Sequence, residues 1–214
     1  MGGSCRGKPT RHAGTGVPLG LTPRHLCLCS RSQLLEDYAP ENKQLAVEGI
    51  VATAGASLET IEDFLAQKRI AIAGISRDPA NFSVKLFEEF CRRGYDVVPV
   101  NPHVTEVQGR RCFARMQDIE PPVEAALLMT SPEATDTVVS DCAEAGIRRV
   151  WMYRAGGNGA VSAKAVQFCQ ERGIQLVPGQ CPFMFWPDAA GFHRFHGFIR
   201  RITGRYPRRT SSRC

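Results

Sequence analysis

The sequence predicts an α/β fold with a doubly wound, five-stranded parallel sheet in a single domain. Five apolar runs typical of strands recur every 24 to 30 residues and begin near Ile70, Tyr95, Ala125, Val150 and Ile174. The runs at 70–73 and 125–129 are continuously apolar rather than alternating, which is typical of parallel strands buried on both faces. A helical pattern separates successive runs, and this alternation of strand and helix predicts a doubly wound sheet.

The expected helices follow the same repeat. Ser57 can cap a first helix whose apolar residues over 58–65 share one face. Ser131 followed by Pro132 predicts another helix start, since proline suits the first helical position. Further apolar stripes at helical spacing lie at 84–91, 138–142 and 165–169. Three helices are expected to end before a glycine, which tolerates the left-handed backbone found there: Gly94, Gly146 and Gly173.

The charge pattern divides the chain into three parts. The net charge is +6, but residues 1–35 carry five basic and no acidic residues, and residues 194–214 carry seven arginines and no acidic residue. Residues 36–193 have 15 basic and 21 acidic residues, so the body is acidic and nucleic acid is not an expected partner. We expect a disordered or weakly helical extension over 1–56, a folded domain over 57–190, and a basic helix and tail over 191–214.

Composition also excludes several classes of protein. No apolar run approaches the ~20 residues of a membrane span, and no segment has the order of a secretory signal. The nine cysteines include no Cys-x-x-Cys pair, so we expect a reduced, cytoplasmic protein rather than a disulfide or zinc framework. His193 and His196 share a helix face and could join Cys181 as metal ligands, but no fourth ligand is present, so no metal site is expected.

Ligands of doubly wound sheets bind at the carboxyl ends of the strands. After the first expected strand, Gly74, Ile75, Ser76 and Arg77 lead into a helix that contains Ser83 and Lys85. A glycine turn before a helix N-terminus is suited to phosphate, because backbone N–H groups and the helix dipole favour an anion. Only the first glycine of a Gly-x-Gly-x-x-Gly pattern is present, so an ordinary loop capped by Asn81 stays the alternative.

The second expected strand ends at Asn101 and Pro102. A sheet that binds NAD usually has an aspartate or glutamate there to accept from the ribose hydroxyls, so Asn101 argues against NAD. The pair suits packing against an adenine, with His103, Arg110 and Arg111 as candidates for an extra phosphate, and a plain turn is the alternative.

The carboxyl ends of the three later strands complete the expected ligand-binding edge of the sheet. Thr130, Ser131 and Pro132 follow the third strand and open a helix towards the same crevice. The fourth strand ends in a loop of small residues at 153–159. This loop either leaves room for an elongated ligand to pass or has no chemical role. The fifth leads to Cys181, which has no base nearby in sequence and is either a packing thiol or a reactive one.

Segment 57–187 resembles the small stand-alone CoA-binding proteins, whose Rossmann-like domain is similar to the CoA-binding domain of succinyl-CoA synthetase α subunits. The resemblance is carried by 64–76, Ser83 with Lys85, 94–102, Gly146-Ile147 and Cys181-Pro182. It implies that coenzyme A or an acyl-CoA is the ligand. The phosphates would lie at Gly74, Ile75, Ser76 and Arg77 with Ser83 and Lys85, the adenine near Asn101 and Pro102, and the pantetheine near Thr130, Ser131 and Pro132.

We therefore expect a non-catalytic CoA-binding or regulatory module, because the ligase part of the synthetase has no counterpart here. The alternative is an NAD(P)-binding oxidoreductase or redox-sensing regulator on the same fold. A subsidiary hypothesis gives Cys181 a mixed disulfide with the CoA thiol. A homodimer or another protein partner stays open, and no membrane contact is expected.

Overall fold

A computed structural model describes residues 49, 54–154, 159–187 and 206–209. These residues all fall in one compact unit, Tyr38–Cys214, and the other unit, Met1–Asp37, lies outside them. Most of the extension expected over 1–56 and the pair His193 and His196 also lie outside the described residues, of which only 49 and 54–56 belong to that extension.

Five parallel strands form one sheet, which confirms the predicted fold class. The strands are β1 (Arg69–Ala73), β2 (Asp96–Val100), β5 (Ala125–Leu128), β6 (Arg149–Tyr153) and β7 (Gln175–Gln180), and their order is β2-β1-β5-β6-β7. In the register, Ala73 lies beside both Val100 and Leu128. The first three strand ends are therefore level, and the loops that follow them leave the sheet at one edge.

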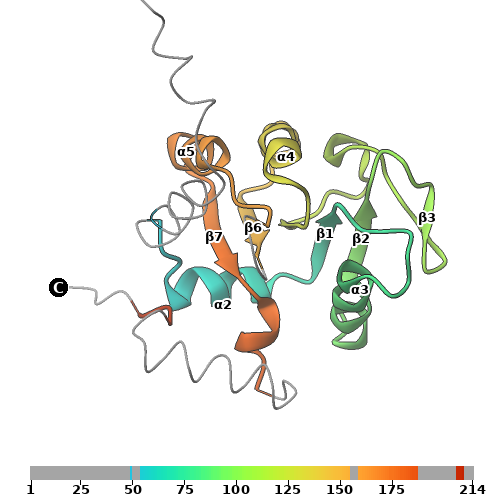
Figure 1. Cartoon of the computed structure of the whole chain (residues 1–214), viewed down its shortest axis with the longest axis horizontal. Helices are drawn as coiled ribbons and strands as arrows, with labels where there is room; N and C mark the ends of the chain where they lie inside the picture. The colour runs from blue at the N-terminus through green and yellow to red at the C-terminus, as the bar shows by residue number, and fades with distance from the viewer. Residues whose placement is uncertain (1–48, 50–53, 155–158, 188–205, 210–214) are drawn as a thin grey trace, which may run out of the picture. The chain divides into compact units, whose positions relative to one another are not determined.

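Helices cover both faces of the sheet (Figure 1). The helices α2 (Leu58–Ala66) and α3 (Phe82–Arg92) lie on one face, and α4 (Pro132–Glu144) and α5 (Ala163–Glu171) lie on the other. Each begins at a side chain that accepts from a backbone N–H of the first turn. Ser57, Asn81 and Ser131 are the predicted caps, and Ser162 is a further one that the sequence did not single out. The glycines expected after α3, α4 and α5 have φ of +84°, +75° and +63°, as predicted.

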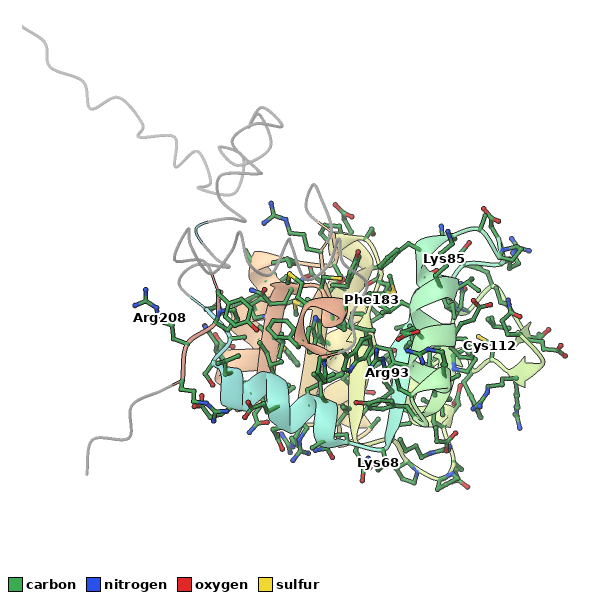
Figure 2. All side chains as sticks on the ribbon, turned by 90° about the horizontal axis from the view of Figure 1, so that it is seen from below. Lys68, Lys85, Arg93, Cys112, Phe183 and Arg208 are labelled. Carbon is green, nitrogen blue, oxygen red and sulfur yellow. The ribbon has the colours of Figure 1, made fainter. Side chains whose placement is uncertain are left out.

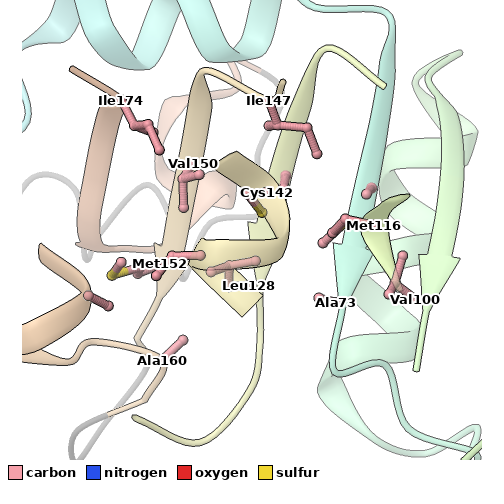
Figure 3. Close-up of a cluster of buried hydrophobic side chains, with 14 of the residues drawn as sticks. Ala73, Val100, Met116, Leu128, Cys142, Ile147, Val150, Met152, Ala160 and Ile174 are labelled. Carbon is pink, nitrogen blue, oxygen red and sulfur yellow. The ribbon is translucent and has the colours of Figure 1, made fainter. Parts of the chain in front are cut away.

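Apolar side chains from the two faces form two separate cores. On the α4 and α5 side, Cys142, Leu128 and Met152 belong to one cluster (Figure 3). On the α2 and α3 side, the buried Trp151 meets the Phe64 ring edge-on at 5.2 Å between centroids. A sheet buried on both faces explains why its strands are continuously apolar.

The segment between β2 and β5 has structure that the strand-helix repeat does not predict. A short hairpin pairs β3 (Glu106–Val107) with β4 (Arg110–Arg111) around Gln108 and Gly109, whose φ angles are +50° and +73°. Two positive φ angles in a two-residue loop are typical of a hairpin turn that matches strand twist. A 3₁₀ turn, η2 (Met116–Asp118), follows, and another, η3 (Pro182–Phe185), follows β7.

The described part of the basic C-terminal segment packs on α2. Arg208 O accepts from Leu58 N at 3.2 Å, and Arg209 forms an ion pair with Glu62 at 2.7 Å. Of the two arginines described in this segment, Arg209 therefore has an acidic partner on α2. Among the described residues, no helix has the length and apolar character needed to cross a bilayer.

Two cysteines of the α4 and α5 core give a test of this packing. Burial raises the pKa of Cys169 to about 12 and also raises the pKa of Cys142. Both side chains are fully buried, so at about pH 8.5, near the ordinary thiol pKa, we expect neither to react with iodoacetamide in the native protein and both to react in urea. Peptide mass spectrometry measures this, and rapid native alkylation of Cys142 or Cys169 would show that the core is not packed as described.

Candidate functional site

β1 and β5 are parallel neighbours in the sheet, and the chain leaves them towards opposite faces. The segment after β1 runs to α3 on one face, and the segment after β5 runs to α4 on the other. Such a switch point opens a crevice at the carboxyl ends of the strands, where ligands of doubly wound sheets bind. The predicted residues Gly74 to Arg77 and Thr130 to Pro132 lie in the two loops that flank this switch point.

Gly74 is the point at which the two sides meet. Its φ is +82°, and a Cβ built on it would lie 2.8 Å from the carbonyl carbon and oxygen of Met129 and 2.9 Å from Cγ2 of Thr130. Gly74 N also donates to Val100 O at 3.0 Å. The glycine therefore lets the loop after β1 lie between the ends of β2 and β5, which no other residue would allow without displacement.

A chain of short hydrogen bonds shapes the loop after β1. Ser83 Oγ accepts from Ser76 N at 2.9 Å and donates to Asn81 Oδ1 at 2.8 Å. Asn81 Oδ1 also accepts from Ser83 N at 2.9 Å. Ser83 is only 3% exposed, so its hydroxyl proton is committed to the loop and is not available to a ligand. The sequence suggested a phosphate donor at Ser83, whereas the structure shows a side chain that holds the loop at the α3 N-terminus.

Donors that remain open lie further out on the same loop. Ser76 Oγ accepts from Asp78 N at 3.1 Å, and its own proton has no acceptor among the described residues. Arg77 and Lys85 are exposed, and neither makes an ion pair or a side-chain hydrogen bond within the described part of the chain. Unpaired cations beside a helix N-terminus favour an anion at this end of the site.

Asn101 connects the end of β2 to the same loop. Its Nδ2 donates to Ile75 O at 2.7 Å, and its Oδ1 accepts from His103 N at 2.8 Å. Both functional atoms of the amide therefore have protein partners, and Asn101 holds Ile75 in place rather than facing a ribose. Pro102 and His103 beside it are exposed, which leaves a rigid edge open for a flat ring.

The two arginines suggested for an extra phosphate lie at different ends of β2. Arg110 Nη1 lies 3.4 Å from Asp96 Oδ1 and donates to Val97 O at 3.2 Å, at the amino end of β2. Arg111 places its guanidinium 4.7 Å from the centre of the Phe113 ring. Arg110 is thus at the edge of the sheet opposite Gly74, and we leave it out of the site.

The segment after β5 has its own hydroxyl chain. Thr135 Oγ1 donates to Ser131 O at 2.9 Å and lies 2.6 Å from Thr130 Oγ1. Since the Thr135 proton is used, the Thr130 hydroxyl donates to Thr135 and keeps only acceptor capacity for a ligand. Ser131 Oγ caps α4 by accepting from Ala134 N at 3.3 Å, and Pro132 follows it as the first residue of the helix.

The ends of β6 and β7 add a group of residues that the sequence did not single out. Tyr153 stacks on Phe82, the first residue of α3, with centroids 5.2 Å apart, and Phe82 meets Phe183 at 5.8 Å. The Gln180 side chain is 4% exposed, and its Oε1 has no hydrogen-bond partner. Burial, with a smaller contribution from the nearby Cys181, raises the pKa of Tyr153 well above its usual range.

Cys181 is 8% exposed and lies directly before η3, at its N-cap position. That burial matches the packing-thiol alternative for this residue. Within the described ranges, no group of three histidine, cysteine or acidic side chains is placed to hold a metal ion.

Comparison with known proteins identifies the family. The family described as "CoA binding domain" matches residues 68–187, which is more than half of the chain and includes all five strands. The chain belongs to the CoA-binding domain family. The expected resemblance is therefore confirmed, and coenzyme A is the ligand class of this domain.

Individual relatives agree with this family and differ in length. The uncharacterized protein YneT of Bacillus subtilis is 25% identical over 114 residues, which are 53% of this chain and 82% of that protein. The acetate–CoA ligase (ADP-forming) II subunit alpha of Pyrococcus furiosus is 24% identical over 56% of this chain, but the match spans only 28% of that subunit. A hypothetical protein from Pyrococcus horikoshii OT3 has a similar structure, with a TM-score of 0.56 and 28% identity over 60% of this chain and 89% of the other.

Gly74 and Gly94 form a matched pair for testing the crevice. Both have φ near +83°, but a Cβ at Gly94 meets nothing within 4 Å. Gly94→Ala should cost only the backbone strain of about 1–2 kcal/mol, whereas Gly74→Ala should cost about 3 kcal/mol or more because it adds overpacking. Urea unfolding measures both, and equal losses for the two variants would contradict the close approach of the β1 and β5 loops.

Proposed function

We propose that this protein binds coenzyme A or an acyl-CoA in the crevice between the β1 and β5 loops, as a binding or regulatory module rather than as an enzyme. The observation that carries the proposal is the junction at Gly74, where a loop with unpaired cations meets the N-terminus of α3. The phosphates would contact the backbone from Gly74 to Arg77. Charge would come from Arg77 and Lys85, and the Ser76 hydroxyl would donate.

The other predicted residues divide into two roles. Ser83 and Asn101 hold the loop through their hydrogen bonds to Ser76 and Ile75, so they shape the phosphate site without touching the ligand. Pro102 offers its exposed edge to the adenine. Thr130, Ser131 and Pro132 line the other wall, where the pantetheine arm leaves the phosphates. A loop held in its binding shape before the ligand arrives lowers the ordering cost of binding.

A nicotinamide role on the same fold has less support. The end of β2 presents no carboxylate for a ribose, and both polar atoms of Asn101 are bonded within the protein. An NAD-binding sheet needs an acceptor at that position. The ligase activity in the name of the archaeal relative belongs to a subunit of which this chain matches only 28%, and we propose only a CoA-binding role for this chain.

The proposal predicts stabilisation by CoA. A ligand at one hundred times its Kd stabilises the native state by about 2.7 kcal/mol, so millimolar CoA should raise the melting temperature by several degrees. NADH at the same concentration should leave it unchanged. Differential scanning fluorimetry with both ligands measures this, and a shift with NADH but not with CoA would reverse the assignment.

Charge reversal at one lysine tests where the phosphates bind. Lys85→Glu should weaken CoA binding about tenfold or more, because a charge-assisted contact of about 1.5–3 kcal/mol is replaced by repulsion. Lys68→Glu is the matched control, since Lys68 is also exposed and Figure 2 shows it on the opposite side of the domain from Lys85. Isothermal titration calorimetry compares the two variants, and equal affinities for them would place the phosphates elsewhere.

A further inference from the structure

The Gln180 side chain is a buried polar group without a partner. Oε1 atoms of two glutamines, Gln117 and Gln180, are buried and unbonded among the described residues. Gln117 Nε2 donates to Asp141 and Glu144 on α4, so that amide has a structural role. Gln180 has no such role, although it is 4% exposed at the carboxyl end of β7. A buried orphan acceptor in a folded protein calls for an explanation.

A bulge determines which way Gln180 points. Met152 pairs with Pro178, but the next residue, Tyr153, pairs with Gln180, so Gly179 is an extra residue in β7 with φ of +67°. An extra residue reverses the alternation of faces along a strand and redirects the side chain that follows. Gln180 therefore lies on the same face of the sheet as Tyr153, which packs with the α2 and α3 core.

This face ends in a small apolar region with one acceptor and one donor. The rings of Phe82, Tyr153 and Phe183 are each half-buried and in mutual contact through Phe82. The Tyr153 hydroxyl makes no hydrogen bond among the described residues, and its raised pKa keeps it protonated as a donor. The acceptor of Gln180 and the donor of Tyr153 belong to paired residues of β6 and β7 beside this aromatic group. Such a pair matches a secondary amide carried on an apolar chain, since its N–H donates and its C=O accepts.

The region also lies where a long ligand would extend. Phe82 is the first residue of α3, so the aromatic group adjoins the helix N-terminus assigned to the phosphates. From β1 to β7 there are three strand spacings, about 15 Å in all. With its phosphates beside β1 and its adenine beside β2, a nucleotide would extend away from β7, whereas an arm attached to those phosphates could continue towards β7 along the edge.

We propose that Gln180 Oε1 and the Tyr153 hydroxyl bind an amide of the pantetheine arm, so that the ends of β6 and β7 distinguish CoA from adenine nucleotides that lack the arm. This rests on the proposed function and adds a specificity site to it. The free protein keeps an unpaired buried amide at Gln180 because the ligand supplies its partner.

The test is the binding of two ligands to Gln180→Leu. The variant should bind CoA about tenfold more weakly and bind adenosine 3′,5′-bisphosphate, which has no pantetheine, with unchanged Kd. Because the substitution removes an unsatisfied buried group, the melting temperature of the free variant should rise by about 2–4 °C. Tyr153→Phe, which removes only the donor, should also weaken the binding of CoA and leave that of the bisphosphate unchanged. This variant provides the test if Gln180→Leu does not fold.

Gln175→Leu is the matched control, because Gln175 is an exposed glutamine at the other end of β7. It should leave both affinities unchanged. The inference is overturned if Gln180→Leu and Tyr153→Phe bind CoA as the wild type does, or if they lose both ligands equally. Wild-type protein that binds neither ligand would instead overturn the proposed function, so the two failures are distinguishable.

Discussion

The contact between Gly74 and the backbone of Met129 is the constraint on which the rest of the site depends. With 2.8 Å between a virtual Cβ and the Met129 carbonyl, the loop after β1 has room only for a glycine. That position brings Ile75 within reach of Asn101 and Ser76 within reach of Ser83. The loop is therefore fixed at its start by packing, and further along by hydrogen bonds from β2 and α3.

The polar side chains around the site are of two kinds: some are hydrogen-bonded within the protein, and others have no partner among the described residues and are available to a ligand. Asn81, Ser83 and Asn101 form a fixed network, and Arg77 and Lys85 carry unpaired charge at its surface. Such a division is expected of a site for a charged ligand, in which a rigid backbone sets the position and exposed cations supply the attraction. At the far end of the edge, the side chains of Gln180 and Tyr153 are uncharged and lie among apolar residues. Such surroundings suit the uncharged pantetheine arm rather than the phosphates.

Much of the fold was predictable because it depends on local rules. The strand runs, the caps at Ser57 and Ser131 and the glycine after α3 are each determined by a few neighbouring residues. Individual roles were less predictable, because they depend on contacts between distant residues. Ser83 resembles a phosphate donor in sequence, yet its proton goes to Asn81, and Arg110 lies at the opposite edge because of a hairpin turn at Gln108 and Gly109. Gln180 gave no sequence signal, since only the bulge at Gly179 turns it towards Tyr153.

The central claim is that CoA binds at the carboxyl edge of the sheet, across the junction between β1 and β5. Backbone amide chemical shifts measured by NMR during a titration with CoA test it most directly. We expect the largest changes in 74–83 and 129–132, with small changes at the amino ends of the strands and in the β3–β4 hairpin. Changes confined to that hairpin or to the amino ends, with 74–83 unaffected, would contradict it.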